Sequence, residues 1–436
     1  MEIKFWNKQI EVIDRDSLSK LQLERLRKTV EMALKTTFYR KRLAEVQIKS
    51  VDDIRTLDDI KRIPFTTKND LRDAYPYGLL SVDKENVVRL HTSSGTTGTP
   101  TVIYHTEEDI RNWTDLIARC ICASGVNRGD VFQNMTTYGL FTGGLGFHYG
   151  AEKMGVLVIP ASSGNTRRQL KLMKDFGTTV IHATPGYLLH IASQLGTYGI
   201  KRPELKLRKA FLGAEPYSEE TRRKIEDLLE IEVYNSYGLS EMNGPGVAFE
   251  CVYKNGMHLW EDSFLMEVID PVTTEVYDDD SEGELVFTTL TRTATPLLRY
   301  RTRDLSRVYS ETCPCGRTHK RIARIKGRSD DMLIINGVNV FPSQIEEVLM
   351  KIPQVGTNYL IEIDKEGVLD RVTVKTEINS KLFTGDISSL NRLEIAIKEQ
   401  IRDTILVNPL IELHEPLSLP VSEGKAKRVI DNRPQI

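Results

Sequence analysis

The sequence is poor in cysteine, nearly balanced in charge and free of long apolar runs. Its 436 residues include five unevenly spaced cysteines, too few for a disulfide framework. The formal net charge of −2 argues against nucleic acid or an anionic membrane as the main partner. No apolar run approaches the roughly 20 residues that a bilayer span requires. Residues 1–16 lack an uninterrupted apolar core, so we expect no signal peptide and a cytoplasmic protein.

Two familiar phosphate-binding loops are also absent. No G-K-[ST] sequence closes a Walker A loop, and the dinucleotide fingerprint G-x-G-x-x-G does not occur. The sequence therefore excludes a P-loop kinase. The apolar fraction of 40% and the charged fraction of 28% are ordinary for a globular protein, and the length predicts two or three domains.

From about residue 87 to residue 290, β-rich runs alternate with helical patterns such as residues 107–125 and 218–230. The candidate strands read VVRLHTS, VLVIPAS, TVIHATP, KAFLGAEP and EVYNSYG. This alternation predicts an α/β fold with mostly parallel sheets and helices. Several of these strands end in Gly-, Ser-, Thr- or Asn-rich loops. Because open α/β sheets bind ligands at the carboxyl ends of their strands, we expect these loops to gather at one edge.

The rest of the chain is assigned by the same patterns. Residues 17–46 predict a packing helix with Ser17 as N-cap, and the acidic residues 278–284 predict a hairpin turn. The composition changes near residue 330. Beyond it we expect a strand, a helix over 342–352, two short strands, a helix over 390–405 and a closing strand. The domains are therefore placed at 1–329, with a helical start over 1–80 and sites over 87–310, and at 330–436, a small mobile α+β domain.

Residues 92–101 read TSSGTTGTPT and follow a β-rich run. Glycines allow backbone N–H groups to turn toward an anion, and the hydroxyl groups add further donors. Taken alone, such a run is more often a surface loop than a phosphate site. Its companions along the chain favour a phosphate site.

Four further segments carry groups suited to a nucleotide: FLGAEP (211–216), YNSYGLSEMNGPG (234–246), LLRYRTRDLS (297–306) and EGKAKRVI (423–430). The ring of Tyr237 can cover a purine, and the carboxylate of Glu241 can hold Mg²⁺. Asp304 can accept both hydroxyls of a ribose, and Lys425 follows a glycine near the C-terminus. Each has a plain alternative as a core tyrosine, a salt-bridged aspartate or a surface lysine. Together, in this order, they predict a two-domain enzyme that binds phosphate and nucleotide.

With the segments YGLFTGGLGFHYG, YRTRD, GRSDDMLIINGVNVFPSQIEE and SEGKAKRVID, this ordered set resembles the adenylate-forming superfamily of acyl-CoA synthetases, peptide-synthetase adenylation domains and luciferases. Within that superfamily the chain is most similar to the phenylacetate–CoA ligase branch, from about Leu18 to Arg433. The resemblance implies that a carboxylate attacks the α-phosphate of MgATP to give an acyl-adenylate and pyrophosphate. Coenzyme A would then displace AMP after the small domain swings about a hinge.

The resemblance also assigns residues, position by position. Lys425 and Glu241 would be catalytic, with Glu241 on magnesium, and Asp330 would be the hinge. The residues that would bind ATP or coenzyme A are Ser93, Ser94, Gly95, Thr96, Thr97, Gly98, Gly213, Ala214, Glu215, Pro216, Asn235, Ser236, Tyr237, Gly238, Asp304, Arg328 and Gly337. Two positions depart from the family pattern. Thr99 or Thr101 stands where the loop usually carries lysine, and Asn336 replaces a basic residue before Gly337.

The acid pocket is expected between residues 138–150 and 243–246. Its candidate residues are Tyr138, Phe141, Gly143, Gly144, Asn243, Gly244 and Pro245. The glycines would leave space and the two rings would flank a flat substrate. By analogy with the branch this suggests an arylacetic acid such as phenylacetate, although plain packing also explains a glycine-rich turn with aromatics.

Cys251, His258, Cys313 and Cys315 form a complete tetrahedral ligand set for structural zinc. The C-x-C spacing is shorter than usual, and His319 competes with His258 as the fourth ligand. The alternative is that the cysteines are buried small apolar residues, as we expect of Cys120 and Cys122. Similar pairs in relatives of this branch favour zinc.

Two other functions stay open at this point. An adenylating enzyme could pass its acyl group to a carrier protein or an amine, and dependence on coenzyme A would distinguish it. A catalytically dead nucleotide-binding protein would be expected to lack Lys425, Glu241 or Asp304, and all three are present. We expect a homodimer only by family analogy.

Overall fold

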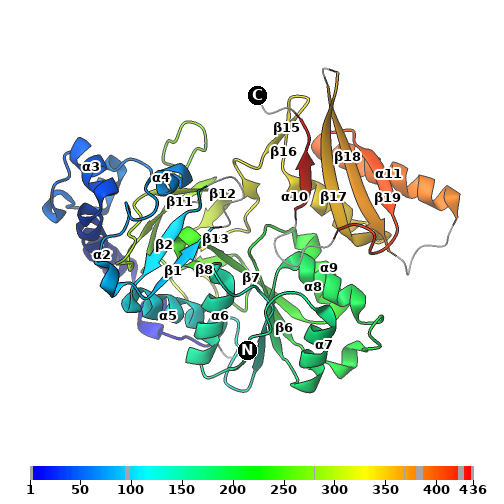
Figure 1. Cartoon of the computed structure of the whole chain (residues 1–436), viewed down its shortest axis with the longest axis horizontal. Helices are drawn as coiled ribbons and strands as arrows, with labels where there is room; N and C mark the ends of the chain where they lie inside the picture. The colour runs from blue at the N-terminus through cyan, green and yellow to red at the C-terminus, as the bar shows by residue number, and fades with distance from the viewer. Residues whose placement is uncertain are drawn as a thin grey trace. The chain divides into compact units, whose positions relative to one another are not determined.

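The computed structural model describes residues 3–93, 99–278, 280–367, 369–379, 386–420 and 427–433. The chain divides into two compact units (Figure 1). The first unit is Met1–Ser162 with Tyr234–Ile325, and the second is Ser163–Val233 with Lys326–Ile436. The domain boundary expected at 329/330 stays a prediction. Within the described residues, no helix is both long enough and apolar enough to cross a membrane.

The first unit begins with helices where one long helix was expected. Its helices are α1 (Lys8–Glu11), α2 (Arg15–Lys35), α3 (Thr37–Glu45), α4 (Lys68–Asp73), α5 (Glu107–Ala123) and α6 (Thr142–Lys153). The expectation of one helix over 17–46 capped by Ser17 is wrong. Asp14 is the N-cap of α2 and accepts a hydrogen bond from the Ser17 N–H. Thr36 is extended, with ψ 148°, and its side chain caps α3. Thr36 therefore ends one helix and starts the next.

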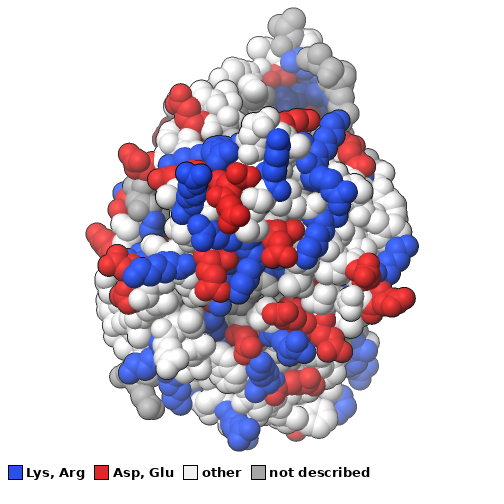
Figure 2. All heavy atoms as spheres, turned by 90° about the vertical axis from the view of Figure 1, so that its left-hand side faces the viewer, with Lys and Arg blue, Asp and Glu red and all other residues white. Residues whose placement is uncertain are grey.

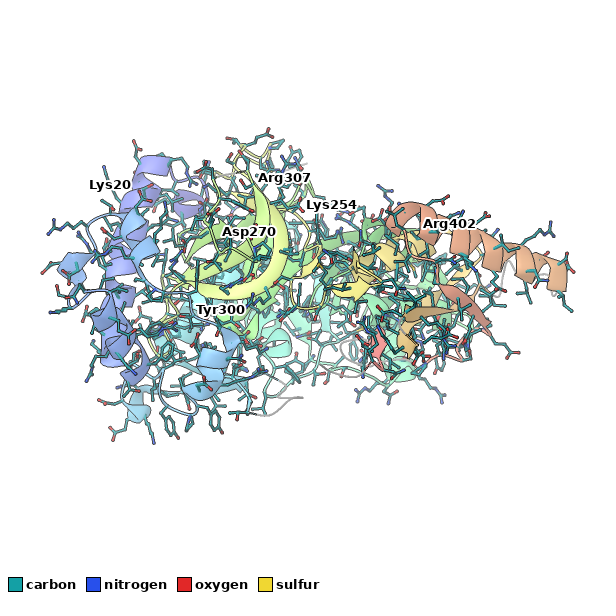
Figure 3. The ribbon with its side chains drawn as sticks, turned by 90° about the horizontal axis from the view of Figure 1, so that it is seen from above. Lys20, Lys254, Asp270, Tyr300, Arg307 and Arg402 are labelled. Carbon is teal, nitrogen blue, oxygen red and sulfur yellow. The ribbon has the colours of Figure 1, made fainter. Side chains whose placement is uncertain are left out.

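Most strands of the first unit pair antiparallel, in the order β10–β11–β12–β13–β9–β8–β7. Their bounds are β7 (Glu232–Leu239), β8 (Gly244–Glu250), β9 (Met257–Leu259), β10 (Phe264–Ile269), β11 (Glu282–Thr289), β12 (Tyr300–Tyr309) and β13 (Arg321–Ile322). Two more pairs are the antiparallel hairpin β1 (Arg89–Thr92) with β2 (Val102–His105) and the parallel β3 (Val131–Asn134) with β4 (Leu157–Ile159). Figure 3 shows β12 between the labelled residues Tyr300 and Arg307. The solvated turn expected over 278–284 is only partly correct, because Glu282, Gly283 and Glu284 begin β11 and Glu284 is buried. Residue 279 lies outside the described residues.

Helices α5 and α6 pack closely against each other and against β8. A Cβ atom on Gly150 of α6 would lie 2.2 Å from Cγ2 of Ile117 on α5. A Cβ atom on Gly146 would lie 2.7 Å from the Trp113 ring. These glycines are therefore required for the helix approach, and they bring α6 up to the Trp113 side of α5.

The second unit contains two segments of the chain. Its first segment holds α7 (Thr166–Asp175), β5 (Val180–Ala183), α8 (Pro185–Gln194), β6 (Lys209–Leu212) and α9 (Glu219–Leu229), and β5 pairs parallel with β6. Its second segment holds the hairpin β15 (Leu333–Ile335) with β16 (Val338–Val340), a four-stranded sheet and two helices. These elements are β17 (Val355–Glu366), β18 (Leu369–Ile378), β19 (Leu410–His414), β20 (Val429–Asp431), α10 (Pro342–Lys351) and α11 (Ile387–Ile405).

The second segment has its own apolar core. The sheet order is β19–β18–β17–β20, and α10 and α11 pack on it and on each other (Figure 1). Buried residues of this core include Ile345 and Leu349 of α10, Ile361 and Ile363 of β17, and Ile397 of α11. The α+β arrangement after residue 330 is confirmed, as is the α/β class of the chain as a whole. The antiparallel run β7–β13 was not part of the expectation.

Basic and acidic side chains alternate on the face of the molecule seen in Figure 2. On α2, Lys28 pairs with Glu24 at 2.7 Å and Lys35 with Glu31 at 3.3 Å. Exposed pairs of this kind contribute little stability, typically under about 1 kcal/mol. This mixed face offers no surface of one sign to a polyanion.

Candidate functional site

Ser93 and Thr101 lie at the two ends of the β1–β2 hairpin, on either side of the predicted phosphate loop. The Thr101 hydroxyl lies 2.8 Å from Ser93 Oγ and 3.4 Å from Oε1 of Glu241. Lys68, at the start of α4, lies 3.5 Å from the same oxygen. Ser94, Gly95, Thr96, Thr97, Gly98 and the catalytic candidate Lys425 lie outside the described residues. The hairpin thus brings its hydroxyl groups to the expected magnesium ligand.

Tyr237 and Asp304 form a second polar pair in the first unit. The Tyr237 hydroxyl donates to Oδ2 of Asp304 at 2.7 Å, and both side chains are buried. Asn235 and Ser236, on the same strand β7, are also buried, and the Asn235 N–H donates to Glu250. The sequence assigned both members of this pair to the nucleotide but did not predict their hydrogen bond.

The turn after β7 holds Glu241 and begins the expected acid pocket. Its 3₁₀ turn, Ser240–Met242, is followed by Asn243 with φ +97° and Gly244 with φ +90°. A Cβ atom on Gly238 would lie 1.9 Å from the Gly244 carbonyl oxygen, and one on Gly244 would lie 2.2 Å from Thr142. Only glycine permits these approaches, which join the turn to the first residue of α6.

Tyr138 is held by a polar chain in front of α6. Its hydroxyl accepts from Nδ2 of Asn134 at 3.0 Å and lies 3.1 Å from Nδ1 of His148. Burial raises the pKa of Tyr138 to about 12. The Asn134 amide also donates to the Gly144 carbonyl at 2.7 Å, which ties Tyr138 to the expected acid segment. Phe141, the residue before α6, is exposed, and Gly143 and Gly144 form the first turn of that helix.

The second unit contains a cavity of about 510 Å³ that includes part of the GAEP segment. Gly186, Glu215 and Pro216 line it together with Arg328, Asp330, Lys427 and Arg428. The Gly186 N–H donates to Glu215 at 3.1 Å. Gly213 directly follows β6, which ends at Leu212, and Ala214 has φ +71°.

The hinge and pantetheine candidates lie in the second segment of this unit. Arg328 forms an ion pair with Asp330 at 2.9 Å. Gly337 lies in the β15–β16 turn with φ +85°, next to Asn336, which exchanges hydrogen bonds with Asp370. Among the described residues, Gly337 is not one of those that line the 510 Å³ cavity.

Cys251, His258, Cys313 and Cys315 are brought together in the first unit, all buried, with ligand atoms within 4.8 Å of one another. The Cys251 and Cys313 sulfurs are 3.7 Å apart, and Cys315 Sγ lies 3.3 Å from Nε2 of His258. Tetrahedral zinc with Zn–S bonds of ~2.3 Å requires sulfurs about 3.8 Å apart. The donor set and its spacing therefore fit a zinc ion.

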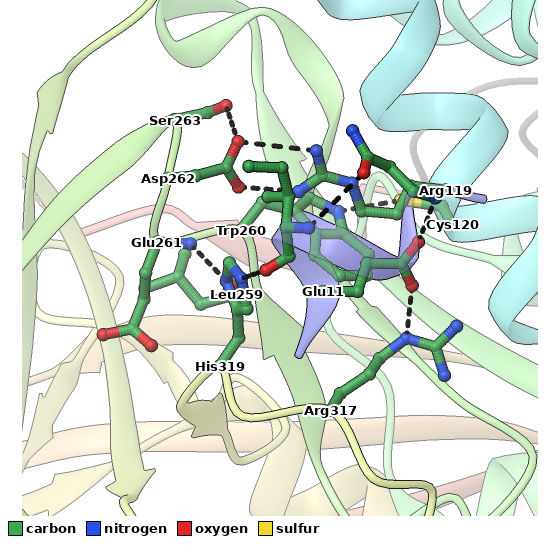
Figure 4. Close-up of polar contacts among 12 residues, drawn as sticks. Glu11, Arg119, Cys120, Leu259, Trp260, Glu261, Asp262, Ser263, Arg317 and His319 are labelled. Carbon is green, nitrogen blue, oxygen red and sulfur yellow. Dashed lines mark hydrogen bonds and ion pairs between the residues drawn. The ribbon is translucent and has the colours of Figure 1, made fainter. Parts of the chain in front are cut away.

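His319 is not part of this cluster. Its Nδ1 accepts from the Glu261 N–H at 2.9 Å (Figure 4), and its Nε2 lies 2.9 Å from the Ile10 carbonyl oxygen. Both ring nitrogens are thus used by the backbone. Of the two candidates for the fourth ligand, the geometry selects His258.

Comparison with known proteins shows the family of the chain. A family described as AMP-binding enzyme matches residues 5–291, and one described as AMP-binding enzyme C-terminal domain matches residues 337–433. A phenylacetate–coenzyme A ligase of Aromatoleum evansii is 45% identical over 98% of this chain and 97% of its own length. Another, from Pseudomonas putida, is 47% identical over 96% of this chain and 95% of its own.

A solved structure also matches along nearly the whole chain. It is a 2-hydroxyisobutyryl-CoA ligase in the postadenylation state with an acyl-AMP, 25% identical, with a TM-score of 0.92 over 98% of this chain and 92% of that one. The chain belongs to the AMP-binding enzyme family, in the branch that contains the phenylacetate–CoA ligases.

Proposed function

We propose that this protein is an AMP-forming ligase that joins an arylacetic acid such as phenylacetate to coenzyme A. The carboxylate attacks the α-phosphate of ATP, which releases pyrophosphate and leaves an acyl-adenylate. The thiol of coenzyme A then attacks the acyl carbon, which releases AMP and a proton and leaves the thioester. The observation that carries this proposal is identity of 42–47% to phenylacetate–CoA ligases over at least 96% of the chain.

In the first step, we assign ATP binding to the residues that the family pattern marks. Glu241 would hold the magnesium ion on the phosphates, because carboxylate oxygen is a ligand that this cation prefers. Ser93 and the loop 94–98 would surround the β- and γ-phosphates, with Thr101 beside them. Asp304 would accept the ribose hydroxyls, and Lys425 would stabilise charge on the α-phosphate. The roles of the remaining nucleotide candidates follow from the same family pattern.

In the second step, we propose that residues 330–436 turn about Asp330. The turn would withdraw Lys425 and bring Gly337 against the pantetheine arm of coenzyme A. The Arg328–Asp330 ion pair lies at the start of this segment, where a change of backbone angles would break it.

The acid would bind beside Tyr138, with the α6 glycines and the Asn243–Pro245 turn as its other walls. The polar chain from Asn134 to His148 fixes the Tyr138 ring, and a fixed ring suits a flat substrate. An aryl acid therefore fits this assignment better than a straight acyl chain. Activation of straight-chain fatty acids at least as well as phenylacetate would contradict it.

The experiment is pyrophosphate release from MgATP with a panel of carboxylic acids, with and without coenzyme A. Release stimulated by an arylacetate, with thioester formed only when coenzyme A is present, is the expected result. Release without thioester would mean that a carrier protein or an amine is the acceptor. No release with any acid would indicate a nucleotide-binding protein without the chemistry.

We also propose that Cys251, His258, Cys313 and Cys315 hold a structural zinc ion. Four protein ligands fill the tetrahedron, so no position is left open for a substrate. Support comes from the 3.7 Å sulfur–sulfur distance and from the burial of all four side chains. Metal analysis of protein purified without a His-tag should give about one zinc per chain. A ratio near zero would contradict the site.

By family analogy we further propose a cytoplasmic homodimer, since ATP and coenzyme A are available in that compartment. Light scattering on the purified protein would give the mass of the assembly. A mass near the 49.6 kDa of one chain would contradict the dimer.

A further inference from the structure

A buried arginine lies beneath the turn that carries Glu241. Arg292, just after β11, is 4% exposed. Its Nη1 donates to the Glu241 carbonyl oxygen at 2.6 Å, and its Nε donates to Oδ1 of Asn243 at 3.0 Å. Its Nη2 donates to the same Asn243 oxygen. The motifs of the sequence gave no indication of this residue.

The guanidinium is buried without a carboxylate in contact. No ion pair among the described residues involves Arg292. Burial lowers its pKa to about 10, although Asp109 and Glu241 favour its charged form from a distance. Burying an unpaired charge is costly, and an apolar side chain would fill the space more cheaply. The hydrogen bonds that Arg292 makes must therefore account for its presence.

Those hydrogen bonds hold a strained backbone. Asn243 has φ +97°, which is unfavourable for a residue with a Cβ atom. Two N–H groups of Arg292 bind its side-chain oxygen, so the side chain is fixed while the backbone stays in this conformation. Gly244 follows with φ +90°, and its carbonyl oxygen packs against Gly238. Because of this close contact, the turn around Asn243 cannot move closer to β7.

We propose that Arg292 and Asn243 form a clamp that positions Glu241 for the magnesium ion on ATP. This inference rests on the proposed role of Glu241 as the metal ligand. Arg292 fixes the Glu241 backbone, and from there the carboxylate reaches Thr101 at 3.4 Å and Lys68 at 3.5 Å. The same clamp fixes Gly244 and Pro245 at the proposed acid pocket. Arg292 is thus a positioning residue that links the metal to the acid.

The test compares Arg292→Met with Arg292→Lys, Asn243→Gly and the double variant Arg292→Met/Asn243→Gly. The Met variant should raise the Mg²⁺ concentration for half-maximal pyrophosphate release about tenfold, the usual effect of losing a charged hydrogen bond. Lysine retains a charged donor and should recover part of the loss. Glycine tolerates φ +97° but removes the acceptor, so it should shift the Mg²⁺ dependence in the same direction. The double variant should be no worse than the Met variant alone.

Arg119→Lys is the matched control. Arg119 is equally buried, but it pairs with Asp262 at 2.6 Å, away from Glu241. This variant should lower the thermal midpoint without changing the Mg²⁺ dependence. If Arg292→Met does not fold, the Arg292→Lys and Asn243→Gly variants carry the test. Unchanged Mg²⁺ dependence in those variants would overturn the clamp.

A second readout separates the clamp from the proposed function. The rise in thermal midpoint on adding MgATP requires nucleotide binding but no acid. If the wild-type protein releases no pyrophosphate with any acid, the ligase proposal fails, and the MgATP-dependent rise still tests the clamp. The clamp predicts a smaller rise in Arg292→Met than in Arg119→Lys, and equal rises would overturn it.

Discussion

Tyr237 and Asp304 act as a pair, because the ring of one residue is fixed by the carboxylate of the other. The 2.7 Å hydrogen bond between them is buried, where such bonds are strong and their loss is costly. The Asp304 N–H also donates to the Thr302 hydroxyl oxygen at 3.0 Å, which fixes the strand at this point. Under the proposed function, the pair aligns the acceptor for the ribose hydroxyls.

Tyr237→Phe should therefore weaken ATP binding without blocking the chemistry. Asp304 would lose the hydrogen bond from the Tyr237 hydroxyl, and a hydrogen bond to a charged group is worth about 1.5–3 kcal/mol. We expect the KM for ATP to rise about tenfold, with a much smaller change in kcat. Steady-state kinetics at saturating acid measures both values.

Tyr39→Phe provides the control for this prediction. The Tyr39 hydroxyl is also buried and hydrogen-bonded, to the Leu298 N–H at 2.9 Å and to Thr66, but none of these residues is assigned to the nucleotide. This variant should lower stability and leave the KM for ATP unchanged. Equal KM values in the two variants would remove the assignment of Tyr237 and Asp304 to the nucleotide site.

His182 on β5 should make stability sensitive to mild acid. Burial lowers its pKa to about 3, so the folded protein keeps this ring neutral while the unfolded chain protonates it near pH 6.5. Between these two values the unfolded state binds more protons, and the free energy of unfolding falls as the pH falls. Each pH unit costs up to ~1.4 kcal/mol from this residue.

His182→Gln should reduce that dependence. Urea unfolding at pH 7, 6 and 5 should give a shallower fall for the variant, whatever its stability at pH 7. His414→Gln is the control, since His414 is only partly buried and lies on the edge strand β19. The control should keep the wild-type slope. A wild-type slope in His182→Gln would show that His182 does not contribute.

At the scale of elements, α10 packs against the start of α9, and this contact joins the two chain segments of the second unit. The Glu346 carboxylate of α10 is 7% exposed and accepts from the Ser218 N–H at 3.0 Å and from the Tyr359 hydroxyl at 2.7 Å. The Thr221 hydroxyl donates to it as well. A carboxylate at a helix N-terminus is stabilised both by free N–H groups and by the helix dipole.

A buried lysine strengthens the same contact. Lys224 of α9 donates to the carbonyl oxygens of Val355 at 3.0 Å and Gly356 at 2.8 Å. Burial lowers its pKa to about 8. Lys427, two residues after Lys425, lines the same cavity as Gly186 and Glu215. Within the second unit, Lys427 thus lies near the GAEP segment.

Glu346→Gln should slow the first half-reaction more than the second. Glutamine has no charge and one acceptor oxygen, so its hydrogen bonds to Ser218, Thr221 and Tyr359 are weaker. The contact between α10 and α9 is therefore weakened by about 1–2 kcal/mol. We expect acid-dependent ATP–pyrophosphate exchange to fall several-fold. Thioester formation from preformed phenylacetyl-AMP and coenzyme A should not slow. Quenched time-course assays of each half-reaction measure the two rates separately.

Glu347→Gln is the control on the same helix. Glu347 pairs with Lys351 at 2.7 Å on an exposed face and makes no contact with α9 among the described interactions. Both half-reactions should keep their wild-type rates in this variant. Equal slowing of both steps in Glu346→Gln would mean that the contact supports folding rather than one of two arrangements.

Periodicity predicted most elements but not every boundary. Helices α5, α9, α10 and α11 and strands β4–β7 lie where the pattern placed them. The apolar spacing continues on both sides of Thr36, so the pattern does not predict that this one extended residue separates α2 from α3. The antiparallel run β7–β13 was also missed, since strand pairing depends on contacts far apart in the sequence.

Motifs marked part of the candidate site. Tyr237, Glu241 and Asp304 were singled out because each lies in a recognisable segment, and their roles stay predictions. Asp304 was expected after a strand but lies within β12. Lys68 and Arg292 were missed because they lie outside any motif and reach Glu241 only through the fold. The cysteine–histidine set was found from residue type alone, and the choice of His258 over His319 needed the structure.

For the whole molecule, the cysteine–histidine cluster connects segments that are distant in the sequence. Cys251 follows β8, His258 lies on β9, and the two other cysteines precede β13. The neighbouring Arg317 reaches back to Glu11 of α1 at 2.7 Å, with both side chains fully buried (Figure 4). A metal bound by these four residues would crosslink the segments around β8, β9 and β13. The Arg317–Glu11 ion pair would connect this crosslinked region to α1.

Under the proposed zinc site, removal of the metal should therefore destabilise the protein before it affects catalysis. Metal affinity at a closed site is folding free energy, so both Cys313→Ser and a zinc chelator should lower the thermal midpoint. We expect a fall of about 5–10 °C, which corresponds to a few kcal/mol for a unit of this size.

Cys122→Ser, a buried cysteine of α5 outside the cluster, is the control and should bind zinc as the wild type does. At a temperature where all variants are folded, Cys313→Ser should retain most of its pyrophosphate release. Loss of activity at an unchanged midpoint would instead place the metal in the chemistry.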